Sequence, residues 1–348
     1  MSTHHTSMSS LATASGQNQL VPFTVAHRLT TPQAALSDEN VLGVFCYGAV
    51  SGGLDDPRLL QVPLECLSGS GHADVLQSAE PVERGRKDGF AFAHNTQAIL
   101  AQLRMEPPAT GDMEAQACEA YQRIHQFLEE LGFPHPLRVW NYLDNINAGD
   151  GDNENYKRFC VGRGRALQTV LDDKHDFPAA SAIGHHDGSG ALIIHLLAAH
   201  SPGIQVENPR QISAFHYPRQ YGIRSPSFSR ARLIHWPRMS HLYLSGTASV
   251  VGHETLYPGD CRAQLMESLR NISSVMETAS TSGEAGIRFD NEHLKLMHVY
   301  MRNRDDLDTA RACIESHFGN DVLVTYLLGD ICRRDLLIEV DGLYCNPA

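Results

Sequence analysis

The sequence is short of positive charge. Its 348 residues include 28 Lys and Arg against 40 Asp and Glu, which gives a formal net charge of −12 at pH 7. A surplus of negative charge repels polyanions unless basic residues gather locally, so we expect no nucleic-acid partner. No apolar run approaches the roughly 20 residues that a membrane-spanning helix needs, and the N-terminus lacks the basic and apolar regions of a signal peptide. We therefore expect a cytoplasmic protein without a membrane association.

Several motifs of metal, cofactor and nucleophile chemistry are also missing. The eight cysteines contain no C-x-x-C pair, which suits a reducing compartment where free cysteine packs as a small core residue. The run His185-His186-Asp187 has no H-x-x-x-H partner, so we expect no metal. Gly162 and Gly164 form a G-x-G without the third glycine of a dinucleotide site, and no G-x-S-x-G elbow is present. The sequence predicts an activity that needs no cofactor.

Apolar periodicity predicts an α+β protein in which one order of elements occurs twice. The first half is expected to contain strands at 41–50, 137–143, 180–184 and 191–197, with helices at 113–131 and 153–171. The second half is expected to contain strands at 242–245, 294–301, 322–328 and 336–340, with helices at 260–276 and 307–317. Three pairs of segments correspond: VFCYGA with YLSGTA, LRVWNYL with MHVYMRN, and ALIIHLL with LLIEVDG. This pattern indicates an internal duplication with a site where the halves meet.

The expected domain organisation follows from this duplication. Residues 1–20 are small and polar and are predicted to be a disordered tail. The N-terminal unit is expected to span 21–201, and the C-terminal catalytic unit 202–348. The stretch 202–237 is rich in Pro, Arg and aromatic residues rather than Gly and Ser, so we expect it to be packed and not a flexible linker.

Glu339 is the first candidate for catalysis. It is a carboxylate on the predicted strand at 336–340, whose other residues are Leu, Leu, Ile and Val. Burial penalises the charged form of a carboxyl group, and a carboxyl that keeps its proton near neutral pH can act as a general acid. The alternative is a solvent-facing position on a half-buried strand, beside Asp335 and Asp341.

Cys332 is the second candidate for catalysis. Arg333 and Arg334 follow it directly, and neighbouring positive charge lowers the pKa of a thiol. The alternative is a small residue that only fills space in the core.

Six further residues are candidates for binding a small anionic molecule: Arg158, Arg163, Tyr217, Tyr221, Tyr300 and Arg302. A guanidinium group is the usual fork for a carboxylate. Strand alternation puts Tyr300 and Arg302 on the same face as His298. Each group also has an alternative interpretation. Arg158 and Arg163 would lie on a solvated helix face, and residues 298–302 would form a solvent-facing row. The proline-rich segment with Tyr217 and Tyr221 would be a plain crossover.

These segments resemble two related protein families. SGTAS near Ser245, the helix at 264–271 and the terminal IEV strand are similar to the imine-deaminase (RidA/YjgF) fold, a mixed sheet with helices on one face. NYKRFCVGRGRAL, NPRQISAFHYPRQYGIRSPSFSRA, SGTASVVGHET and GDICRRDLLIEVDG resemble the chorismatases, two-domain enzymes whose catalytic domain is RidA-like. The resemblance covers about residues 40–345 and is most specific in the last hundred. It implies two RidA/YjgF-like units.

The chorismatase resemblance also implies a reaction. Members of that family remove the enolpyruvyl group of chorismate and release pyruvate, together with a dihydroxycyclohexadiene acid, 3-hydroxybenzoate, or both 3- and 4-hydroxybenzoate. The glutamate that matches Glu339 is their acid. Gly246, which would make room for the ring, and Cys332, which would guide the intermediate, together imply the hydroxybenzoate-forming type. Three alternatives remain: a chorismate hydrolase, a RidA-like imine deaminase, and a sensor without catalysis, in each case a monomer with pseudo-symmetric halves or a homo-oligomer.

Overall fold

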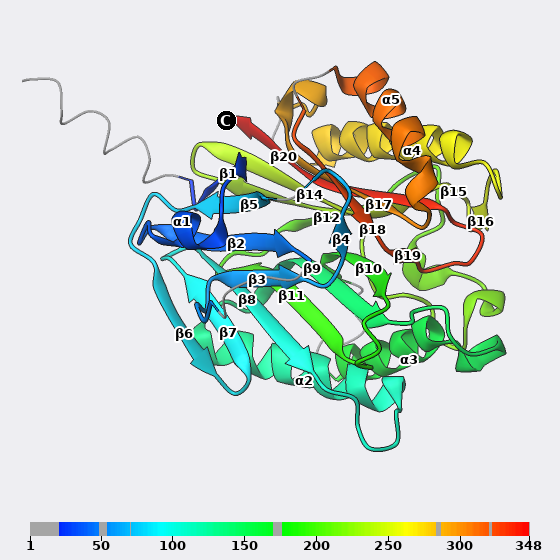
Figure 1. Ribbon diagram of the computed structural model, residues 1–348, viewed down its shortest axis with the longest axis horizontal. Helices are drawn as coiled ribbons and strands as arrows, with labels where there is room; N and C mark the ends of the chain where they lie inside the picture. Colours follow the sequence, from blue (N-terminus) through cyan, green and yellow to red (C-terminus); the bar gives the residue numbers. More distant parts are fainter. Residues whose placement is uncertain are drawn as a thin grey trace, which may run out of the picture.

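The computed structural model describes residues 21–48, 54–69, 71–169, 176–282, 287–319 and 322–347. The expected tail at 1–20 lies outside these ranges. Two seven-stranded mixed sheets lie in the middle of the molecule, with one pair of helices on each outer side (Figure 1). No helix among the described residues is long and apolar enough to cross a membrane. The expected α+β class, with two mixed sheets that carry helices on one face, is confirmed.

The first of these sheets is built mainly from the N-terminal half. Its strand order is β19-β10-β9-β11-β8-β7-β6. The strands are β6 (Glu83–Lys87), β7 (Phe90–His94), β8 (Ala98–Met105), β9 (His135–Asp144), β10 (Ala179–His185), β11 (Leu192–Ala199) and β19 (Asp330–Ile331). Helices α2 (Met113–Leu131) and α3 (Asn155–Gln168) pack against its outer face through a core that includes Phe127, Phe159 and Leu196.

The second sheet is built mainly from the C-terminal half. Its strand order is β12-β13-β14-β20-β17-β18-β4. The strands are β4 (Glu65–Cys66), β12 (Ile204–Val206), β13 (Ala231–Trp236), β14 (Met239–Ala248), β17 (Leu294–Met301), β18 (Val324–Leu328) and β20 (Ile338–Pro347). Helices α4 (Cys261–Ser282) and α5 (Leu307–Phe318) cover its outer face, with Leu265, Leu269 and Ile314 in the core between them. Each half lends an edge strand to the other, β4 in one direction and β19 in the other.

The two sheets have the same topology, as an internal duplication requires. The order β6-β7-β8-β11-β9-β10 corresponds position by position to β12-β13-β14-β20-β17-β18, and β9/β10 and β17/β18 are the parallel pairs. The predicted match of ALIIHLL with LLIEVDG is therefore correct, because β11 and β20 hold equivalent positions in the two sheets. The predicted match of VFCYGA with YLSGTA is wrong, because β2 (Val41–Tyr47) belongs to another sheet and β8 is the counterpart of β14. Short apolar strands resemble one another too closely for sequence to separate them.

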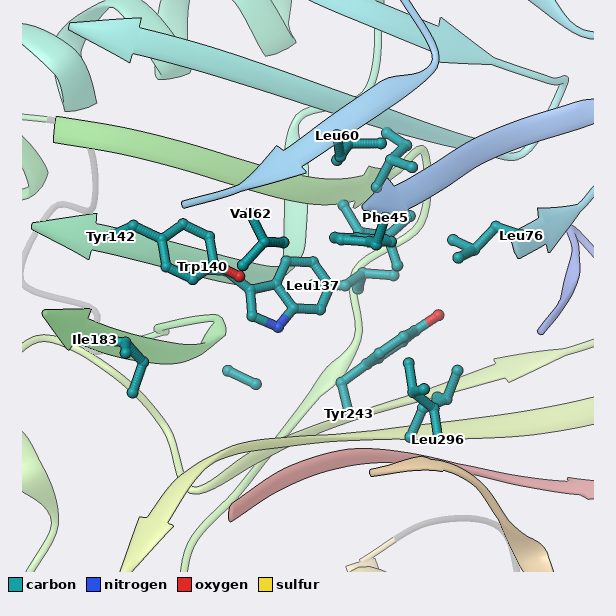
Figure 2. Packing of buried hydrophobic residues seen from close by; sticks show 14 of the residues in the cluster. Phe45, Leu60, Val62, Leu76, Leu137, Trp140, Tyr142, Ile183, Tyr243 and Leu296 are labelled. Atoms are coloured by element: carbon teal, nitrogen blue, oxygen red, sulfur yellow. The ribbon is translucent and has the colours of Figure 1, made fainter. Parts of the chain in front are cut away.

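The third sheet was not expected. Its order is β1-β5-β2-β3, with strands β1 (Thr24–Leu29), β3 (Leu59–Val62) and β5 (His72–Gln77) beside β2, and the short helix α1 (Pro32–Leu36) follows β1. Figure 2 shows its Phe45 and Leu60 close to Trp140 of β9, with Tyr243 and Leu296 of the second large sheet nearby. The remaining elements are short: β15 (Val250–Val251), β16 (Glu254–Thr255), η2 (Gly151–Asn153), η3 (Ala214–His216), η4 (Arg219–Tyr221), η5 (Asn291–His293) and η6 (Arg304–Asp306).

Both faces of the central strands are buried. Met297, Val299 and Met301 of β17 pack toward α4 and α5, whereas Tyr300 packs into the core between the sheets. The alternation predicted for this strand is therefore confirmed, but the alternative of a solvent-facing row is wrong for His298 and Tyr300. The reason is the first sheet, which covers the face of the second sheet that would otherwise be exposed to water. Polar side chains on this face point into the interior of the protein.

Candidate active site

A cavity of about 320 Å³ lies where the two halves meet. Its wall comes from the start of α3, from the segment between β12 and β13, from the end of β14, and from residues 332–339. Five of the residues predicted from the sequence line it: Tyr217, Tyr221, Gly246, Cys332 and Glu339. A cavity with polar groups from several elements is the usual form of a small-molecule site.

Glu339 projects from the middle of the second sheet toward the first. Its strand, β20, lies between β14 and β17, and only 4 % of the residue is exposed. Burial, and then the negative charge of Asp341, raise the pKa of the Glu339 carboxyl to about 8, although the guanidinium of Arg138 opposes this shift. The group therefore carries a proton at neutral pH, and the alternative of a solvent-facing carboxylate is wrong. A neutral carboxylic acid at a cavity wall is able to donate a proton to a bound molecule.

Gly246 lies directly beside this acid. A Cβ atom at position 246 would stand 1.8 Å from Oε1 of Glu339 and 3.1 Å from Oγ of Ser181. The carboxyl group of Glu339 therefore occupies the space beside Gly246. The sequence led us to expect that this glycine makes room for a ring of the ligand, whereas in the structure it makes room for the acid.

Cys332 lies in the turn after β19 and faces the same cavity. Burial raises the pKa of its thiol well above the ordinary value, and the neighbouring Glu339 adds to this effect. The guanidinium of Arg333 acts in the opposite direction but is outweighed. The prediction of a lowered thiol pKa is therefore wrong: Arg333 does act to lower it, but the loss of water around the sulfur, which sequence adjacency does not reveal, has the larger effect. Cys332 is a neutral thiol.

Three arginines line the cavity, Arg230, Arg333 and Arg334, and the sequence reasoning did not select any of them as a ligand-binding group. Arg230 donates hydrogen bonds from Nη2 to the backbone oxygen of Ile212 (2.7 Å) and to the hydroxyl of Tyr217 (2.8 Å). Its Nε is buried and has no hydrogen-bond partner in the part of the chain that the structure describes. Arg333 lies 3.9 Å from the ring centre of Tyr221 and 5.2 Å from that of Tyr217. The aromatic rings and guanidinium groups form a stacked wall that suits an anionic ligand.

The segment that carries these tyrosines is fixed to both halves. Arg219 of η4 forms two hydrogen bonds with Asp152 of η2, at 2.9 and 2.7 Å. The hydroxyl of Tyr221 lies 3.3 Å from Nδ1 of His253 in the C-terminal half. The expectation that residues 202–237 form a packed connection is confirmed.

Comparison with known proteins covers most of the chain. Residues 74–198 match the family model for the N-terminal part of the FkbO/Hyg5-like chorismatases. A 3-hydroxybenzoate synthase from Streptomyces hygroscopicus is 33% identical over 320 residues, which are 87% of this chain and 91% of the relative. The chain belongs to the chorismatase family. A chorismatase from Streptomyces rapamycinicus is 36% identical over 279 residues, which are 78% of this chain and 81% of that protein.

A solved chorismatase structure extends this likeness to three dimensions. Its crystal structure has 30% sequence identity to this chain and a TM-score of 0.81, and the match covers 93% of this chain and 99% of the other. The duplicated arrangement of two mixed sheets is thus the fold of the chorismatase family.

The other residues predicted to bind substrate lie away from the cavity wall of this chorismatase-family member. Arg158 pairs at the surface with Asp112, at 2.7 Å. Arg163 is buried over the ring of Tyr121, at 4.8 Å, and its Nε and Nη2 have no hydrogen-bond partner among the described residues. What distinguishes Arg230 and Arg333 is that the fold brings them to the same cavity as Glu339, which sequence spacing does not reveal.

Arg302 and Tyr300 do not line the cavity, but they hold residues next to it in place. Arg302 donates hydrogen bonds to the backbone oxygens of Ile331 (3.0 Å), Arg333 (3.1 Å) and Leu336 (3.0 Å), so it shapes the turn that carries Cys332. Tyr300 is paired with Glu339 across β17 and β20, and its hydroxyl donates to Asp341 at 2.9 Å. Both residues act on the cavity through other residues.

One cluster among the described residues has the composition of a metal site. Ligand atoms of Asp144, His185 and Asp187 lie within 4.8 Å of one another, because Asp144 and His185 are register partners at the ends of β9 and β10. The carboxylates already accept hydrogen bonds from the following turn, Asp144 from the amide of Gly190 at 2.7 Å and Asp187 from the amide of Ser189 at 2.9 Å. These bonds give the cluster a role in the turn, and we assign no metal to it.

Proposed function

We propose that this protein removes the enolpyruvyl group of chorismate to give pyruvate and 3-hydroxybenzoate, with Glu339 as the proton donor. The observation that carries this proposal is a nearly buried carboxyl group, neutral at pH 7, at the wall of a cavity that Arg230 and Arg333 also line. An enol ether with two carboxylates needs both a proton donor and cationic groups. The names of the relatives, 3-hydroxybenzoate synthase and chorismatase, support the same reaction.

The chemistry begins with proton transfer from Glu339 to the methylene carbon of the enol ether. The side chain of the substrate becomes an oxocarbenium ion, the C–O bond to the ring breaks, and its electron pair completes the carbonyl group of pyruvate. The oxygen of the neighbouring ring hydroxyl then bonds to the vacated ring carbon, which gives an epoxide, and the hydroxyl proton returns to Glu339. Protein dipoles and charges stabilise the developing cation in place of water.

The epoxide leads to the aromatic product. The bond between its oxygen and the original hydroxyl carbon breaks, the carbon that keeps the oxygen loses its hydrogen as a proton, and the oxygen gains a proton. The result is 3-hydroxybenzoate, and every carbon and oxygen atom of both products comes from chorismate. Opening of the other C–O bond gives 4-hydroxybenzoate instead. Cys332, a neutral thiol that faces the same cavity as Glu339, is the group we propose to guide this choice.

Arg230 and Arg333 are the groups we propose to hold the carboxylates of the substrate. Arg230 has an Nε–H group that is buried without a partner in the described structure, so a bound carboxylate would satisfy it. Arg333 keeps its orientation through the backbone oxygen of His253 and the ring of Tyr221. Fixed donors of this kind lose little freedom when a ligand binds. Tyr217, which contacts both guanidinium groups, is proposed to complete the binding wall.

The test is incubation of the purified protein with chorismate. Pyruvate is followed with a coupled lactate dehydrogenase, and the ring products are separated by chromatography. We expect pyruvate and 3-hydroxybenzoate in equal amounts, and in water enriched in heavy oxygen we expect no label in the hydroxybenzoate. A dihydroxycyclohexadiene acid in place of the aromatic product would identify a hydrolase. Turnover of an imine without turnover of chorismate would identify a deaminase, and chorismate binding without turnover would identify a sensor.

A further inference from the structure

Asp341 lies two residues beyond Glu339 on β20, so both side chains project from the same face of the strand. Its carboxylate accepts four hydrogen bonds. Ser181 and Tyr300 donate to Oδ2, at 2.8 and 2.9 Å, and Arg138 donates to the same oxygen as an ion pair. His298 lies 2.9 Å from Oδ1 through its Nδ1. With so many donors, Asp341 is fixed in place and held in its charged form.

This arrangement extends into all three sheets. Arg138 comes from β9 of the first sheet, and His298 from β17 of the second. The other ring nitrogen of His298 lies 3.0 Å from Asp74, a fully buried residue of β5 in the four-stranded sheet. The two carboxylates raise the pKa of His298 to about 9, despite its burial. The imidazolium and the guanidinium of Arg138 together balance the two carboxylates, so four ionised side chains lie in this one network.

The charges that bear on Glu339 are few. The titratable groups that face it from neighbouring elements are Asp341 on its own strand, Tyr300 on β17, Arg138 on β9, Tyr156 on α3 and Cys332 in the turn after β19. Burial raises the pKa of both phenols and of the thiol, so these three groups are neutral. The carboxylate of Asp341 and the guanidinium of Arg138 are left as opposed charges next to the acid.

We propose that Asp341 is a positioning residue whose fixed negative charge keeps Glu339 protonated and prevents it from forming an ion pair with Arg138. The position of Asp341 next to Glu339 explains why so many charges are buried here despite the cost in free energy. Without the carboxylate of Asp341, the positive charge of Arg138 would act on Glu339 unopposed, and Glu339 would then lose its proton. Asp341 occupies the guanidinium and so reserves Glu339 for the reaction. This inference rests on the proposed function only in one respect, namely that the proton of Glu339 is donated to the substrate.

The proposal predicts shifts of opposite sign in two variants. Asp341→Asn removes the negative neighbour and frees Arg138, so the pKa of Glu339 falls by at least about one pH unit, as an unscreened positive charge requires. Arg138→Met removes the opposing positive charge, so the pKa of Glu339 rises. Infrared difference spectra against Glu339→Gln follow the carbonyl band of the protonated acid in each background as a function of pH. The measurement needs no substrate.

Asp74→Asn is the matched control, because it removes an equally buried carboxylate from the same network without touching Arg138. We expect its Glu339 titration to match the wild type. A residue with a merely structural role would leave the titration unmoved in both test variants or move it in the same direction, and either result would overturn the proposal. If Asp341→Asn does not fold, as circular dichroism would reveal, the rise predicted for Arg138→Met still decides the question.

The same variants separate this inference from the proposed function. In a protein that turns over chorismate, the alkaline limb of pyruvate release follows the infrared midpoint, acidward in Asp341→Asn and alkaline in Arg138→Met. Opposite infrared shifts without any release of pyruvate by the wild type would contradict the proposed function and leave the role of Asp341 intact. Pyruvate release with infrared midpoints that do not shift would contradict the role of Asp341 alone.

Discussion

The carboxyl group of Glu339 occupies the space that a side chain at Gly246 would fill. A Cβ at 246 would lie 1.8 Å from Oε1 and 2.6 Å from Cδ of Glu339, distances that no packed structure tolerates. The glycine on β14 therefore determines where the acid on β20 stands. A different side chain there would place the acid differently against the substrate.

Gly246→Ala tests this contact. The added methyl group must displace the Glu339 carboxyl, so we expect pyruvate release to slow by at least about tenfold, which corresponds to about 1.4 kcal/mol in the barrier. The ring products should shift toward the diene acid. Gly85→Ala is the control, because Gly85 lies on β6 away from the cavity and its added methyl would meet only the ring of Phe92, at 3.2 Å. Wild-type rate and products in Gly246→Ala would show that the acid does not depend on this space.

The pH dependence of the reaction reports the protonation of Glu339. The active form is the neutral acid, and the pKa of this group is raised to about 8. The rate should therefore stay level below that pH and fall about tenfold for each further pH unit above it. Measurement of kcat/KM for pyruvate release across this range gives the midpoint. A rate that rises through pH 8 would mean that an ionised group performs the essential step.

Arg230 and Arg333 should act mainly on substrate binding. Replacement of either by Gln removes a charge-assisted hydrogen bond worth about 1.5–3 kcal/mol, so KM should rise roughly ten- to a hundredfold while kcat changes less. Arg158→Gln is the matched control, since Arg158 is paired with Asp112 at the surface. The expected pattern is a raised KM in the two cavity variants and an unchanged KM in the control. A raised KM in Arg158→Gln, with an unchanged KM in the two cavity variants, would indicate that α3 binds the carboxylates of the substrate.

Sequence reasoning found the parts of the site that depend on local context. The apolar neighbours of Glu339 indicate burial, and two tyrosines between prolines indicate a packed segment, so both features could be predicted. The role of Asp341 could not, because it depends on Arg138 and Ser181, which lie more than a hundred residues away in the chain. The sheet formed by β1, β2, β3 and β5 was missed for a related reason. Its strands are short, and a strand of four to seven residues carries too few side chains to reveal its partners.

Cys332 should affect the products more than the rate. Cys332→Ala leaves Glu339 to start the cleavage, so chorismate should still be consumed, but the ratio of 3-hydroxybenzoate to 4-hydroxybenzoate and diene acid should change. Cys160→Ala, a change at another buried thiol with a raised pKa, should leave that ratio at the wild-type value. Chromatography of the ring products decides between these outcomes. An identical product ratio in both variants and the wild type would assign Cys332 a packing role only.

The account depends most on Glu339 as the proton donor, and the direct measurement is pyruvate release by Glu339→Gln. Glu154→Gln is the matched control, because Glu154 is a second glutamate that lines the same cavity. Both proteins should bind chorismate and unfold at temperatures close to that of the wild type, since each replacement preserves side-chain size. We predict that Glu339→Gln loses at least about a hundredfold in the rate of pyruvate release, the scale expected when a general acid is lost, and that Glu154→Gln keeps most of its activity. A folded Glu339→Gln protein that retains more than about a tenth of the wild-type rate would contradict the account, because the loss would then fall short of that general-acid scale.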